Sequence, residues 1–186
     1  MTESELDKYR QFFSPMIKEL LKDNSKFYRF NEPIKYSFFY NEDARIFATC
    51  DRNQNTVNVN INSLIIAYEE KDFLTIEYYL LHEVRHIFQH LIISDYLNNI
   101  EICIEKGIVK KWIKEENNYI KSCDDDGNEN EEYFKQDIEM DAYAFAYAII
   151  KYKYNKVDTL YVPKIYGDDF RVLVNDWIDR FKEEKL

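Results

Sequence analysis

Glycine and proline are scarce in this chain of 186 residues, which contains only three of each. Both residues interrupt helices and mark turns, so their scarcity argues against a many-turned β-sandwich and favours long helices. No apolar run approaches the ~20 residues that a membrane-spanning helix needs. Apolar residues nevertheless make up 46% of the chain. At this length, that composition predicts one domain, residues 1–186, with a sizeable core.

Cysteine is also rare, and its three positions do not suggest a disulfide framework. Cys50, Cys103 and Cys123 are odd in number, widely spaced and free of any CxxC pair. This pattern is typical of a protein kept reduced in the cytoplasm. The first residues, MTESELDKYRQFF, lack a basic start followed by an apolar run, so we expect no signal peptide. We therefore expect a cytoplasmic protein with no membrane partner.

Positive charge is in deficit, and the formal net charge is -10. Such a surface repels a phosphate backbone, so we expect no direct binding to nucleic acid. Acidity can favour a basic substrate, but more often it keeps a protein soluble.

The first half of the chain combines helical and strand patterns. Val57, Val59 and Ile61 alternate with asparagines, which predicts a half-exposed strand at 56–61. A turn before it suggests an antiparallel hairpin with 44–50. The remaining elements expected here are an amphipathic helix at 4–22, a strand at 34–40 and a short helix at 64–71 capped by Ser63.

The second half is predicted to be helical. The apolar spacing indicates helices at 73–94, 98–120, 131–153 and 168–184, and an acidic loop at 122–132. The loop lacks the carboxylates of a calcium loop at its first and twelfth positions, Ser122 and Tyr133, so we do not expect calcium there. The predicted fold class is α+β, mostly helical with a small antiparallel sheet.

Residues 82–86 read HEVRH, which is the HExxH pattern of zinc hydrolases. Residues four apart on a helix share one face, so His82 and His86 can hold one metal ion. Glu83 lies near enough to take a proton from a water that the metal activates. The motif predicts hydrolysis with Zn²⁺ as cofactor.

A helical wheel supports this interpretation. With His82 at zero and about 100° per residue, His86 falls at about 40° and Glu83 at about 100°. The apolar residues gather on the opposite side, as they would if the helix formed the floor of a cleft. The alternative is a chance motif on an exposed helix face, with both histidines on the surface.

Two residues in or near the motif are not expected to bind the metal ion. His90 lies on the histidine face, but eight residues of helix span about 12 Å, too far for one ion with bonds of about 2 Å. Arg85 falls at about 300°, where a solvent-exposed or salt-bridged side chain is expected.

Catalytic zinc usually takes three protein ligands, so a third is needed. No further histidine can reach the ion, which leaves a carboxylate on the helix at 131–153. Glu139 is favoured over Asp137 and Asp141, which fall about 160° and 200° away. The residues within about 60° of Glu139 are small or apolar: Ala142, Tyr143, Ala146 and Ile150. A carboxylate in such a stripe needs compensation, either by the metal or by a salt bridge to lysine or arginine. If Glu139 is not the ligand, Asp141 is next in line.

Together, HEVRHIFQH and IEMDAYAFA resemble the ImmA/IrrE-type zinc metallopeptidases. The resemblance covers about residues 35–153 and includes the VNVNIN strand before the metal helix. It departs from the family pattern in the long stretch between the motifs and in the absence of an evident helix-turn-helix module. The resemblance implies a zincin-like fold and a cytoplasmic endopeptidase, which in some members cleaves a repressor encoded with it.

In the expected mechanism, His82, His86 and Glu139 bind zinc while Glu83 acts as general base and then as acid. One more donor would share the oxyanion, and Tyr143, Tyr147 and His90 are candidates between which the sequence does not choose. The strand at 56–61, if it is an edge beside the cleft, could bind an extended substrate.

Three other functions remain open at this point. The chain could be a zinc hydrolase acting on a substrate other than a peptide. It could be a peptidase-like module that binds a regulatory protein without cutting it, although the intact Glu83 argues against this. It could also be a helical structural protein with an accidental motif.

Overall fold

The structure, a computed structural model, describes residues 1–28, 30, 33–123, 130–157 and 160–186. Most of the predicted acidic loop, residues 124–129, lies outside this part of the chain. The helices are α1 (Glu3–Asp23), α2 (Ser25–Tyr28), α3 (Ile61–Glu69), α4 (Phe73–Leu97), α5 (Lys106–Asn117), α6 (Glu131–Phe134), α7 (Asp137–Tyr154) and α8 (Asp168–Glu183). The strands are β1 (Lys35–Phe39), β2 (Ala48–Asp51) and β3 (Thr56–Asn60). The structure is therefore rich in helix with one small sheet, which agrees with the α+β class.

The sheet is mixed, so the expectation of an antiparallel sheet is wrong for one of its two pairings. The order is β1-β3-β2, with β2 antiparallel and β1 parallel to β3. The predicted hairpin is confirmed, because β2 and β3 are its two arms. Val57 and Val59 are buried and alternate with the less buried Thr56 and Asn58, as the pattern predicted, but Asn60 at the end of the strand is fully buried. Since β3 is the central strand, it cannot be the edge that binds an extended substrate.

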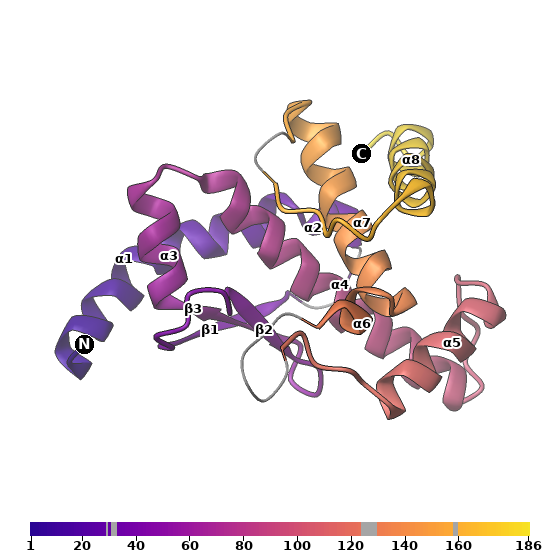
Figure 1. The fold of residues 1–186 in the computed structure, drawn as a ribbon, viewed down its shortest axis with the longest axis horizontal. Coiled ribbons are helices and arrows are strands. Elements are labelled where there is room, and N and C mark those ends of the chain that lie inside the picture. Colours follow the sequence, from indigo (N-terminus) through magenta and orange to yellow (C-terminus); the bar gives the residue numbers. More distant parts are fainter. Residues whose placement is uncertain (29, 31–32, 124–129, 158–159) are drawn as a thin grey trace.

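Helix α4, which carries the HExxH motif, crosses the middle of the molecule (Figure 1). The sheet packs on one side of it and α7 on another, while α5 lies against its C-terminal half. Asp72 caps its first turn by accepting a hydrogen bond from the Thr75 N–H at 3.2 Å. Because so many elements surround it, α4 buries residues on all sides and not on one face only.

Two predicted helices differ from the observed ones. The helix expected at 98–120 begins only at Lys106, because α4 continues to Leu97 and Asn99 then adopts a left-handed backbone with φ of 58°. The helix expected at 131–153 is broken into α6 and α7. Gln136, between them, has extended backbone angles, and its side chain bonds the backbone of Ile120.

The cap of α3 also differs from the prediction. Asn60, not Ser63, precedes the helix, and its side-chain oxygen accepts from the Asn62 N–H at 3.1 Å. The Asn60 amide also donates to three carbonyl groups in the loop between β1 and β2. Ser63 lies inside the helix and donates to the Ala44 carbonyl oxygen at 2.8 Å. This polar network joins α3 to the sheet.

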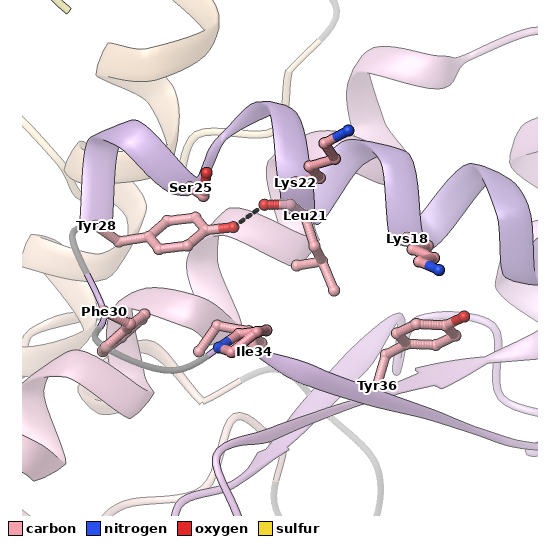
Figure 2. Close-up of a pocket in the computed structure, with 9 residues that line it drawn as sticks. Lys18, Leu21, Lys22, Ser25, Tyr28, Phe30, Ile34 and Tyr36 are labelled. Carbon is pink, nitrogen blue, oxygen red and sulfur yellow. Dashed lines mark hydrogen bonds between the residues drawn. The ribbon is translucent and has the colours of Figure 1, made fainter.

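An apolar cavity of about 610 Å³ lies between α1, α2 and β1 (Figure 2). Figure 2 shows the Tyr28 hydroxyl pointing to the Leu21 carbonyl oxygen, with Ile34 and Tyr36 on the facing wall. Its lining, as far as the structure describes it, contains no histidine and no carboxylate, so it is not where the motif predicts chemistry. Within the described residues, no helix has the length and apolar character to cross a membrane.

Candidate metal centre

The two motif histidines lie one turn apart on α4 and face each other. Their Nε2 atoms are 3.0 Å apart. His82 is only 3% exposed and His86 5%, because α7 packs over this part of α4. The alternative of two surface histidines on an exposed helix face is therefore wrong.

Glu139 on α7 completes a group of three possible metal ligands. Its Oε2 lies 3.5 Å from the Nε2 of His82 and 3.4 Å from that of His86, and the side chain is fully buried. All three ligand atoms lie within 4.8 Å of one another. Three atoms with these separations can share a point about 2 Å from each, the usual length of a zinc–nitrogen or zinc–oxygen bond. The donor set, two imidazoles and one carboxylate, thus fits a metal ion such as zinc.

Within the described residues, no lysine or arginine pairs with Glu139, which was the other explanation for a carboxylate in an apolar stripe. Its Oε1 accepts a hydrogen bond from the Tyr119 hydroxyl at 2.8 Å, and its Oε2 accepts one from Tyr133. Its remaining neighbours are the two imidazoles. Two phenols and two histidines therefore compensate the buried charge.

The charges of this group shift one another's pKa values. Burial alone would lower the pKa of His86, but the Glu139 carboxylate outweighs it and raises that pKa to about 9. Burial alone would raise the pKa of Glu139, but His86 and His82 hold it well below its usual range. Without a metal, the site therefore favours a protonated imidazole beside a carboxylate. A metal ion would replace that proton.

Gln89 determines which nitrogen of His86 carries a proton. The Gln89 amide nitrogen donates to the Ile138 carbonyl oxygen at 2.9 Å and to Asp141 Oδ2 at 2.8 Å, so its oxygen faces His86. That oxygen lies 2.8 Å from His86 Nδ1, which must then be the donor. In the neutral imidazole, Nε2 keeps its lone pair and faces His82 and Glu139. This is the arrangement that a metal-ligating histidine needs.

Asp141 and Arg85 form an ion pair behind the histidines. Arg85 Nε donates to Asp141 Oδ2 at 2.7 Å, which confirms the salt-bridged option for Arg85 and excludes the solvent-exposed one, since the residue is 3% exposed. Asp141, the reserve third ligand, lies outside the group of possible ligands. Its link to the ligand group is the hydrogen bond from Gln89, which in turn holds His86.

Glu83, the predicted general base, follows His82 on α4 and is half-buried. Its carboxylate interacts with the side chain of Cys50 in β2. Burial and then the negative charge of Glu83 raise the pKa of the Cys50 thiol. The side chain of Glu83 therefore extends from α4 toward the edge strand β2.

The three candidates for an oxyanion donor lie in different surroundings. The Tyr143 ring packs on the His82 ring, with centroids 4.2 Å apart. The Tyr147 ring, one turn further along α7, packs on Phe170 of α8. His90 lies 3.4 Å from Glu116 and is not part of the ligand group, as its spacing predicted. Of the three, Tyr143 is the one whose ring packs on a possible ligand in the part of the chain that the structure describes.

Four contributors to the site were not identified from the sequence: Gln89, Tyr119, Tyr133 and Arg52. Gln89 was within reach of a wheel, because it lies three residues after His86 on the same face. Tyr119 follows α5 and Tyr133 lies in the one-turn helix α6, and the periodicity of neither predicted helix shows that these side chains meet Glu139 of α7. Arg52 follows β2 and contacts the ring of Tyr119, which is far from it in the sequence.

Comparison of the chain with protein-family models, with curated proteins and with solved structures found no match. Its function is therefore inferred from the side chains of the site.

Proposed function

We propose that the chain is a zinc-dependent endopeptidase of the ImmA/IrrE type with a zincin-like fold. We place it in the cytoplasm, with a protein substrate such as a DNA-binding repressor encoded beside it. One observation carries the proposal: His82, His86 and Glu139 are buried with their ligand atoms within 4.8 Å, and the motif carboxylate Glu83 follows directly on the same helix.

His82, His86 and Glu139 would hold the zinc ion, and the two histidines would do so through Nε2. A zinc ion in this position supplies Lewis acidity, which polarises a carbonyl group and lowers the pKa of water. Gln89 keeps the proton of His86 on Nδ1 and thereby frees Nε2.

Glu83 moves the proton in this proposal. Its carboxylate takes a proton from the attacking water and delivers it to the leaving amine, as a general base and then a general acid. Among the described residues, no lysine or arginine forms an ion pair with Glu83, so its carboxylate is available as a base. An extended peptide added to the edge strand β2 would run beside it.

The first test is the metal content of protein purified without added metal. We expect about one zinc per chain in the wild type, and a large loss of zinc in His82→Ala and in Glu139→Ala. Wild-type protein free of metal would exclude both the peptidase and any other zinc hydrolase.

The second test is cleavage of the DNA-binding protein encoded next to this chain. We expect Glu83→Gln to retain zinc and to lose cleavage, while Glu101→Gln, an exposed glutamate after α4, cleaves as fast as the wild type. A zinc-loaded wild type that binds this protein without cutting it would support the binding module instead. Cleavage by Glu83→Gln at the wild-type rate would exclude Glu83 as the base.

A further inference from the structure

Each carboxylate oxygen of Glu139 receives its own phenol. The Tyr119 hydroxyl donates to Oε1 at 2.8 Å, and the Tyr133 hydroxyl donates to Oε2. The two tyrosines come from separate segments: Tyr119 follows α5, and Tyr133 lies in α6. A phenol ordinarily titrates near pH 10, so at neutral pH both hydroxyls are protonated and can donate to the carboxylate.

The two oxygens of Glu139 have different tasks. Oε2 is the one that lies 3.4 and 3.5 Å from the histidine Nε2 atoms, so it is the ligand oxygen of the candidate centre. Oε1 is held by Tyr119. A carboxylate can bind a metal through one oxygen or through both, and the second mode uses an additional coordination position. A hydrogen bond to Oε1 favours the first mode, because it competes with the metal for that oxygen.

The position of Tyr119 is supported by a contact of its ring and by hydrogen bonds of the next residue. Arg52, which follows β2, stacks over the ring at 5.8 Å and pairs with Glu116 of α5 at 2.6 Å. The next residue, Ile120, is bound at both its N–H and its carbonyl group by the side chain of Gln136, each at 3.1 Å. The sheet, α5 and the start of α7 therefore all hold the segment that delivers this hydroxyl.

We propose that Tyr119 and Tyr133 are positioning residues: Tyr119 keeps Oε1 off the metal, so that Glu139 binds through one oxygen and leaves a coordination position free for reaction, and Tyr133 orients the ligand oxygen Oε2. This inference rests on the proposed metal centre and deepens it. Catalytic zinc differs from structural zinc in keeping such an open position. The hydrogen bond from Tyr119 to Oε1 would therefore decide which kind of site this is.

The experiment is a titration of the purified, metal-free protein with Co²⁺, followed by its visible absorption. Four-coordinate cobalt absorbs more strongly than five-coordinate cobalt. We expect Tyr119→Phe to weaken the absorption, because the freed Oε1 adds a fifth bond. We expect Tyr133→Phe to keep the wild-type spectrum but to bind cobalt 10–100-fold more weakly in competition with a chelator, as for other residues that orient a metal ligand.

Tyr166→Phe is the matched control. The Tyr166 hydroxyl is buried in the same aromatic region and has no hydrogen-bond partner among the described residues, so its removal should change neither spectrum nor affinity. Tyr119 is 41% exposed, so Tyr119→Phe gives a folded variant even if Tyr133→Phe does not fold.

The outcomes separate this inference from the proposed function. If the wild type binds no cobalt, the metal centre itself is refuted and the inference falls with it. Suppose that the wild type binds cobalt, that Tyr119→Phe shows the wild-type spectrum and that Tyr133→Phe binds cobalt with the wild-type affinity. The metal centre then stands, and the positioning role is refuted. Equal changes in Tyr166→Phe would attribute the effects to general loss of packing and would also refute the role.

Discussion

At the scale of single residues, a hydrogen-bonded chain runs from Asp141 through Gln89 to His86. Each bond fixes the orientation of the next group: Asp141 accepts from the Gln89 amide, and the Gln89 oxygen accepts from His86 Nδ1. Such supporting partners hold a ligand ring in place and set its tautomer. The identity of residue 89 should therefore affect metal binding although residue 89 is not a ligand.

We predict that Gln89→Leu lowers metal affinity roughly 10–100-fold, because His86 loses the acceptor that keeps its proton on Nδ1. Competition with a chromophoric chelator measures this affinity. Asn24→Leu is the control, since it removes an equally buried amide that bonds Glu77 at 2.7 Å, away from the ligands. Similar affinity losses in both variants would mean that destabilisation, and not the tautomer, weakens binding.

At the scale of elements, Arg85 joins the helices that surround α4. Its guanidinium lies over Trp112 of α5, Phe145 of α7 and Trp177 of α8, at 5.7, 5.1 and 4.6 Å from the ring centroids. Its charge is balanced by Asp141 of α7. A buried cation in an aromatic cage is stable only while that partner remains.

We predict that Asp141→Ala destabilises the fold by about 3–5 kcal/mol, because it leaves Arg85 buried and unpaired. Urea denaturation followed by circular dichroism measures the free energy of unfolding. Asp168→Ala, which removes the exposed partner of Arg171, should cost no more than about 1 kcal/mol. If the two variants lost equal stability, the ion pair would not be what joins these helices.

At the scale of the whole molecule, the candidate metal ligands join α4 to α7, the two central helices. The metal-free pair contributes stability above the unfolded pKa of Glu139, near 4.5, because its folded pKa is lowered. For His86, whose folded pKa is raised to about 9, the contribution is complete below 6.5 and is lost as pH rises through about 9. Metal binding depends on pH in the opposite direction, since it requires the His86 imidazole without that proton.

We predict that zinc stabilises the protein more at pH 8.5 than at pH 6, because less protonated His86 competes with the metal. Zinc at a hundred times its dissociation constant adds about 2.7 kcal/mol, which for a chain of this size is a rise in Tm of roughly 5–10 °C. Differential scanning calorimetry measures the rise, and His86→Ala should abolish it at both pH values. The same rise at pH 6 and pH 8.5 in the wild type would contradict the assigned pKa of His86.

The sequence alone determined the local features of this protein. The four-residue spacing of His82 and His86 follows from helix geometry, and the alternation around Val57 and Val59 follows from strand geometry. Glu139 could be selected from its stripe of small residues, because a buried carboxylate needs a partner. Periodicity sufficed for these positions because each depends on one element only.

Only the tertiary structure decided how the elements meet. The parallel pairing of β1 with β3, the burial of Arg85 in its aromatic cage and the two phenols on Glu139 each join segments far apart in the chain. Local spacing cannot encode them, because the energy of such contacts depends on which distant side chain fills the neighbouring space. The sequence thus determined which residues could bind a metal, and the packing of α4 against α7 decided that three of them lie together.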